Sequence, residues 1–132
     1  MKFQKSNLVA ESKVVTTDFG ELLGMYFVCE KVAKSIAENE KNEDRSLHLT
    51  TLKKGIKKLN LNVSEYDINL IFNKGWKNKA KNQMSFRNIR DSVCHNCSIA
   101  NRDFAIKNKT QYKQAMQAFL DEIYKLIERK RK

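Results

Sequence analysis

Apolar residues recur at intervals of three or four positions in several stretches of the chain, as they do in amphipathic α-helices. The first stretch runs from Asp18 to Ala37, and Asp18 with Glu21 three residues later has the pattern of an N-terminal capping box. Its apolar residues are Leu22, Leu23, Tyr26, Cys29, Val32, Ala33, Ile36 and Ala37. We therefore expect a long helix here, with Val14 and Val15 either extending it or forming a separate turn.

Two shorter helices are expected after a charged turn at residues 41–46. The first covers residues 49–59, where apolar side chains mark one face and lysines the other. The second begins at Ser64, which can cap the helix because Asp67 follows three residues later. Residues 73–83 come next and are expected to form a basic loop that contains the one tryptophan.

The last third of the chain predicts two more helices. Ser85 is a suitable cap for a helix whose core-facing stripe is Phe86, Ile89, Val93 and Cys97. A final helix begins near Thr110, and its inward positions are Tyr112, Ala115, Met116, Phe119, Ile123 and Ile127. Helices joined by short connections predict an all-α protein, an antiparallel bundle of four or five helices that forms one domain over residues 1–132.

Composition agrees with this fold and limits the cellular compartment in which the protein is expected. The 132 residues are 41% apolar, include no proline and only four glycines, and suffice for one ordinary core. Three cysteines are a poor disulfide framework, and the N-terminus lacks the apolar run of a signal peptide. No stretch approaches the roughly 18 apolar residues of a membrane span, so we expect a soluble protein of the reducing cytoplasm, with no membrane partner.

The net charge of +11 indicates a polyanionic partner, such as RNA, DNA or an acidic protein. The alternative is a lysine-rich composition that reflects codon usage alone. Charge does not decide between these interpretations, so the chemistry has to come from a motif.

The segment 86–97 concentrates the chemically versatile side chains. On a straight helix Asn88, Asp91, Ser92 and His95 share a polar face, whereas Arg90 lies roughly 140° around the helix from His95. One chain would therefore have difficulty in aiming both side chains at one phosphate. Either the helix ends near Cys94 and frees His95, or two copies pack this face together around a two-fold axis.

Arg90-Asp91-Ser92-Val93-Cys94-His95 resembles the R-x4-H motif of HEPN (higher eukaryotes and prokaryotes nucleotide-binding) domain ribonucleases. The helix order and length are also similar to that family. The resemblance implies a homodimeric, metal-independent endoribonuclease that needs no cofactor and acts in a toxin-antitoxin system, in antiviral defence or in RNA processing. An antitoxin or effector complex is then an expected partner, although Cys97 stands where some relatives carry a modified tyrosine.

The residue chemistry fits this implied activity. His95 can exchange a proton near neutral pH, Arg90 can hold the scissile phosphate, and Asp91 can orient the imidazole. Additional RNA contacts are expected from residues near the motif and in the basic loop: Arg87, Asn88, Ser92, Lys74, Trp76, Lys77, Lys79 and Lys81. Arg87, Asn88 and Ser92 could equally be solvated helix surface, and Trp76, which could stack on a base, could simply be core.

Three other interpretations remain open. Some HEPN relatives are inactive and serve only as RNA-binding or scaffold modules. Residues 49–73 could form a helix-turn-helix of a DNA-binding regulator, although the helix from Ser64 has its basic residues beyond its end. Cys94 and Cys97 have the spacing of half a zinc site, but the only other soft ligands, Cys29 and His48, belong to other helices, so we expect no metal.

Overall fold

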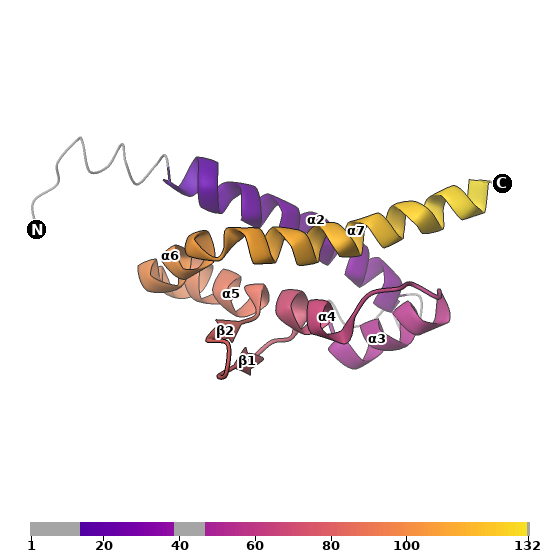
Figure 1. Cartoon of the computed structure of the whole chain (residues 1–132), viewed down its shortest axis with the longest axis horizontal. Coiled ribbons are helices and arrows are strands. Elements are labelled where there is room, and N and C mark those ends of the chain that lie inside the picture. Colours follow the sequence, from indigo (N-terminus) through magenta and orange to yellow (C-terminus); the bar gives the residue numbers. More distant parts are fainter. Residues whose placement is uncertain (1–13, 39–46, 132) are drawn as a thin grey trace, which may run out of the picture.

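The computed structural model describes residues 14–38 and 47–131, which are mostly helical (Figure 1). The elements in chain order are a π-helical turn η1 (Val14–Phe19), α2 (Gly20–Glu38), α3 (Leu49–Lys58), α4 (Glu65–Phe72), β1 (Lys77–Asn78), β2 (Gln83–Met84), α5 (Phe86–Asn96), α6 (Ile99–Lys107) and α7 (Lys109–Arg131). The all-α class is therefore confirmed. The charged turn expected at residues 41–46 lies outside the described residues.

The first long helix starts earlier than its sequence pattern indicated. Helical backbone runs without interruption from η1 into α2, so Val14 and Val15 extend the helix, and a cap at Asp18 is wrong. Phe19 is 2% exposed and its ring lies 6.0 Å from that of Phe86, which packs this turn against the core. Asp18 instead lies beside the N-terminus of α7, 3.9 Å from Lys109 Nζ.

Serine caps begin three of the shorter helices. Ser64 Oγ accepts from Asp67 N–H at the start of α4, and Ser85 Oγ accepts from Asn88 N–H at the start of α5. Both caps were predicted. Ser98 caps α6 in the same way, and α6 is a helix that the apolar pattern did not predict.

The core-facing stripe of α5 is shorter than expected. Phe86 and Ile89 are fully buried and Val93 is partly buried, but Cys97 is exposed, so its assignment to the core is wrong. The physical reason is that the helix stops before it: Cys97 has a left-handed backbone, with φ of 53° and ψ of 40°. Its side chain therefore no longer follows the helical stripe.

The two long helices, α2 and α7, lie side by side and run in the same direction (Figure 1). Glu21 Oε2 lies 2.7 Å from Lys109 Nζ near the start of both helices, and about two turns further along each helix Cys29 Sγ lies 3.8 Å from the Met116 carbonyl. An antiparallel arrangement is therefore wrong for this pair. The chain returns to the start of α2 through the four shorter helices, which pack beneath the long pair.

An aromatic cluster joins the two groups of helices. Tyr26 of α2 lies 5.2 Å from Phe86 of α5, measured between ring centroids, and Phe86 lies 5.5 Å from Tyr112 of α7. Phe72 at the end of α4 lies 5.3 Å from Phe119. Such tilted and edge-on ring pairs are favourable beyond the area that they bury. The N-terminal half of α5 is thus anchored in the core, which fixes where its polar side chains point.

In the described parts of the chain, no helix combines the length and apolar character that a membrane span requires.

Candidate functional site

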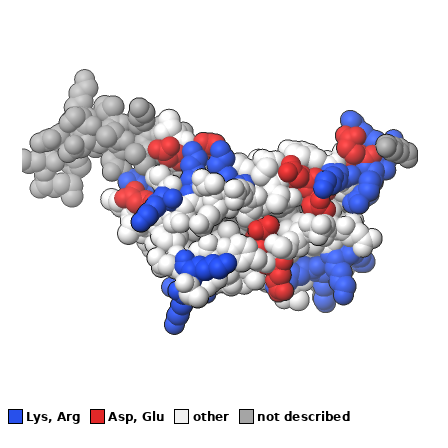
Figure 2. All heavy atoms as spheres, in the orientation of Figure 1, with Lys and Arg blue, Asp and Glu red and all other residues white. Residues whose placement is uncertain are grey.

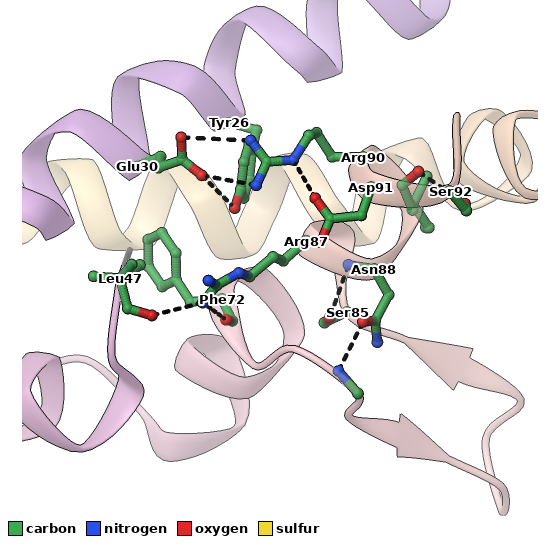
Figure 3. Close-up of polar contacts among 12 residues, drawn as sticks. Tyr26, Glu30, Leu47, Phe72, Ser85, Arg87, Asn88, Arg90, Asp91 and Ser92 are labelled. Atoms are coloured by element: carbon green, nitrogen blue, oxygen red, sulfur yellow. Dashed lines mark hydrogen bonds and ion pairs between the residues drawn. The ribbon is translucent and has the colours of Figure 1, made fainter. Parts of the chain in front are cut away.

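Helix α5 directs its polar residues to opposite sides. Because Phe86 and Ile89 face the core, Arg90 extends toward α2, whereas Asn88 extends toward the segment that precedes the hairpin (Figure 3). The helix continues through His95 to Asn96, so the interpretation in which it ends near Cys94 is wrong.

Arg90 belongs to a compact polar cluster with α2. Its Nη2 lies 3.2 Å from Glu30 Oε2, and its Nε donates to Asp91 Oδ1 at 2.7 Å. The guanidinium carbon lies 5.2 Å from the centroid of the Tyr26 ring, a cation–π distance. Tyr26 OH donates to Glu30 at 2.9 Å, and Lys34 Nζ lies 3.7 Å from the same carboxylate. These contacts fix the orientation of the Arg90 fork.

Burial and charge act together on the ionisation of this cluster. Burial, reinforced by the Glu30 carboxylate, raises the pKa of Tyr26, so its hydroxyl remains a donor. Burial lowers the pKa of Arg90, but Tyr26, Glu30 and Asp91 together raise it more, and the net shift is upward. Arg90 therefore keeps its charge while 20% of its side chain stays exposed.

His95 lies in the last turn of α5 and is exposed. Within the described parts of the chain, no hydrogen bond or ion pair holds its imidazole. The side chain therefore remains accessible to a substrate or to another protein chain, and it does not share the cluster around Arg90. Within one chain, Arg90 and His95 therefore have different surroundings.

Arg87 has a structural role that the sequence did not reveal. Its Nη1 donates to the Leu47 carbonyl at 2.9 Å and to the Phe72 carbonyl at 3.2 Å (Figure 3). These two bonds tie α5 to the segment just before α3 and to the end of α4. Its Nε is buried without a hydrogen-bond partner. The Arg87 guanidinium thus holds the fold together.

Asn88 and Ser92 also have partners within the chain. Asn88 Oδ1 accepts from Gly75 N–H at 2.7 Å and its Nδ2 donates to the Trp76 carbonyl at 3.2 Å. Ser92 Oγ accepts from Asn101 Nδ2 of α6 at 2.8 Å. Asn88 therefore holds the hairpin on α5, and Ser92 holds α6 on α5. The contacts within the chain account for the positions of both side chains without an RNA ligand.

The basic loop is a short hairpin that projects from the start of α5. Its four lysines are exposed. Figure 2 shows basic side chains at the lower edge of the molecule, where the hairpin lies, apart from the basic groups over α3 and over the end of α7. The lysines are Lys74, Lys77, Lys79 and Lys81. Trp76 is partly buried and packs against the core.

An aromatic residue that the sequence did not single out stands beside this hairpin. Tyr66 of α4 is 38% exposed, its ring meets Trp76 edge-on at 6.0 Å, and Lys81 Nζ lies 5.2 Å from its centroid. Tyr66 OH also donates to Gln83 at 2.6 Å. A partly exposed aromatic ring beside a lysine is an arrangement that can stack on an unpaired base.

The helix-turn-helix interpretation gains no support from the arrangement. Helix α4 contains no lysine or arginine, and Ile68, Leu70 and Ile71 are buried where it packs on α5 and α7. Helix α3 packs on α2 instead. A recognition helix must present its first residues to the major groove, and α4 begins with Glu65.

Metal ligands do not gather in the described part of the chain. No three His, Cys, Asp or Glu side chains there lie close enough together to hold one ion. Cys94 and Cys97 are exposed and Cys29 is buried, and all three thiols are free.

No protein-family model matches the chain, and no curated protein or solved structure is significantly similar to it.

Proposed function

We propose that this chain is a HEPN-like, metal-independent endoribonuclease that acts as a cytoplasmic homodimer. The observation that carries the proposal is the arrangement of Arg90 and His95 on one helix. The Arg90 guanidinium is fixed in place and partly exposed, and His95 is exposed and has no hydrogen-bond partner among the described residues. A fixed fork of N–H donors is suited to a phosphate, and an exposed imidazole is suited to proton transfer. A toxin-antitoxin, antiviral or RNA-processing context fits such an activity.

In the proposed reaction a ribose 2′-hydroxyl attacks the adjacent phosphate and leaves a 2′,3′-cyclic phosphate. His95 takes or returns the proton, and Arg90 stabilises the charge that develops on the phosphate oxygens. Asp91 keeps the Arg90 fork oriented through the 2.7 Å bond to Nε. This role replaces the one first expected for Asp91, which was to orient the imidazole.

A dimer resolves the separation of the two residues. If α5 packs on its copy around a two-fold axis, Arg90 of one protomer can face His95 of the other. An exposed apolar side chain beside the cluster supports such contact: Phe27, one turn before Glu30 on α2, is 46% exposed.

A catalytically silent RNA-binding or scaffold module is the second candidate. It is favoured by the charge around Arg90, because the Glu30 and Asp91 carboxylates together with Lys34 leave the cluster without net positive charge. In that case RNA would be held by the hairpin lysines and Tyr66, without cleavage.

The decisive experiment is cleavage of labelled RNA by the full chain with and without EDTA, with the products tested for a 2′,3′-cyclic phosphate. His95→Ala should abolish cleavage, and it should fold normally because the side chain is exposed. His48→Ala is the matched control and should remain active. Cleavage that persists unchanged in His95→Ala rules out the histidine mechanism, and RNA binding without cleavage by the wild type favours the silent module.

Mixing two inactive variants tests the shared site. Arg90→Lys and His95→Ala dimers are each expected to be inactive, but a mixed dimer keeps one intact pair, namely Arg90 from one chain and His95 from the other. After exchange of equal amounts, roughly a quarter of the wild-type rate should return, because about half of the dimers are mixed and each has one of two sites. No recovery in a mixture shown to contain mixed dimers contradicts a site shared between chains.

The hairpin surface is tested by RNA binding in the His95→Ala background. Replacing Lys77, Lys79 and Lys81 by glutamine should weaken binding and reduce its salt dependence, because each phosphate contact releases counterions. Replacing Lys53, Lys54 and Lys57 of α3 removes the same charge elsewhere and is the control. Equal losses from both sets would mean that net charge, not the hairpin, holds the RNA.

A further inference from the structure

The end of α5 carries two exposed thiols on either side of His95. Cys94 lies in the last helical turn and Cys97 is the residue that ends the helix, and both are free. Cys29 is different, since it is buried between α2 and α7 and burial raises its pKa to about 12. The exposed pair is thus the chemically accessible dithiol of the described chain.

The spacing of the pair is close to that of a disulfide. Positions three apart on an α-helix have Cα atoms about 5 Å apart, from its rise and radius, and disulfides span roughly 4.4–6.8 Å. Because Cys97 has left the helical backbone conformation, its Cβ does not keep the helical spacing from Cys94, and a bridge needs the two Cβ atoms about 3.5–4.5 Å apart. A bond between Cys94 and Cys97 therefore requires a small local movement rather than a new fold.

The backbone at Cys97 is where that movement is easiest. Its φ of 53° is a left-handed conformation, which costs a residue with a side chain about 1–2 kcal/mol. Only Ser98 separates it from α6. Two backbone bonds hold the turn, from Cys97 N–H to the Val93 carbonyl at 3.1 Å and from Ser98 N–H to the Ser92 carbonyl at 3.2 Å.

We propose that Cys94 and Cys97 form a reversible disulfide that deforms the last turn of α5 and displaces His95. The ring closed by this bond contains His95 and Asn96, so any shift of the turn moves the imidazole. The site is thus a dithiol that responds to a hydroperoxide, and its effect on RNA cleavage rests on the function proposed above. A transient disulfide of this kind is compatible with a reducing compartment.

The oxidation balances with one hydrogen peroxide. One thiolate attacks a peroxide oxygen, which breaks the O–O bond and, with one proton, gives a sulfenic acid and water. The second thiolate attacks the sulfenic sulfur, forms the S–S bond and releases hydroxide, which takes up a proton as a second water. Two thiols and one peroxide thus yield one disulfide and two waters, and dithiothreitol reverses the reaction.

The test is mass spectrometry of the full chain treated with hydrogen peroxide, with free thiols then alkylated. In the expected product, the peptide that contains both cysteines has lost two hydrogen atoms, and the protein still runs as a single chain on a non-reducing gel. Cys29 should react with the alkylating reagent only after the protein is unfolded. Cys94→Ser and Cys97→Ser should each prevent it. Independent oxidation of the two thiols to sulfinic acids, or a covalent dimer between chains, overturns the proposal.

Cleavage assays form the second arm. If the reduced chain cleaves RNA, the disulfide form should be at least about tenfold slower, because small misplacement of a catalytic group has effects of that order or larger. Cys97→Ser should keep its rate after peroxide treatment. A disulfide that forms without slowing cleavage overturns the displacement of His95. If the reduced chain cleaves no RNA, the proposed function fails, and the mass measurement still decides whether the disulfide forms.

Discussion

Replacing Arg87 by methionine separates a structural arginine from an RNA-contacting one. The substitution keeps an unbranched apolar stem and removes the donors to the Leu47 and Phe72 carbonyls. Hydrogen bonds from a charged group contribute roughly 1.5–3 kcal/mol each to the free energy of unfolding. The buried Nε without a partner costs about 1–3 kcal/mol, and its removal offsets that part of the loss. We expect Arg87→Met to lower the free energy of unfolding by about 2–3 kcal/mol.

Urea denaturation followed by circular dichroism measures this change. With an m-value of roughly 1.5–2 kcal/mol/M, the midpoint should fall by about 1–2 M. Lys54→Met, an exposed basic residue on α3, is the matched control, and its stability should change by less than about 0.5 kcal/mol. An unchanged midpoint combined with a large loss of RNA affinity would refute the structural role of Arg87.

Three further substitutions test the packing, the charge and the capping of the helices. Gly55→Ala should lower the free energy of unfolding, measured in urea, by roughly 1–3 kcal/mol, because the new Cβ meets Ile36 Cγ2 of α2 and this outweighs the helix preference of alanine. Ile36→Leu removes that methyl group, so it should reduce the destabilisation caused by Gly55→Ala. Two lysines of α7 lower the pKa of Glu21 from 4.5 to about 2, so the Glu21 carboxylate should stabilise the fold above about pH 4.5 and lose this effect as the pH falls toward 2. In Glu21→Gln the melting temperature should therefore change less with pH over that range. Ser85→Ala removes the buried cap of α5 and should lower the free energy of unfolding by about 0.5–2 kcal/mol, with Ser35→Ala on the exposed face of α2 as the control.

Local signals predicted local structure well. Ser64 and Ser85 were recognisable as caps because the side chain and the N–H that it accepts from are three residues apart. The capping box at Asp18 was wrong because packing of Phe19 in the core kept the preceding turn helical. The end of α5 was misplaced because the stripe through Cys97 assumed a straight helix, although Ser98 offered the same kind of signal as the other caps.

Partners distant in the sequence could not be predicted in this way. Arg90 and Glu30 are 60 residues apart, and nothing in either segment indicates that they meet. The same holds for Arg87, whose acceptors are backbone carbonyls that any residue provides. Periodicity identifies which face of a helix is buried but not the direction of its neighbour, so the parallel course of α2 and α7 became visible only in the fold.

The pairing of α2 with α7 also affects how the protein is made. These are the first and the last α-helices of the described chain, so Cys29 of α2 cannot reach the Met116 carbonyl until the ribosome has synthesised α7. Contacts that join the two ends of a chain form late in folding, because a long loop must close first. Truncation within α7 should therefore yield a protein that is unfolded.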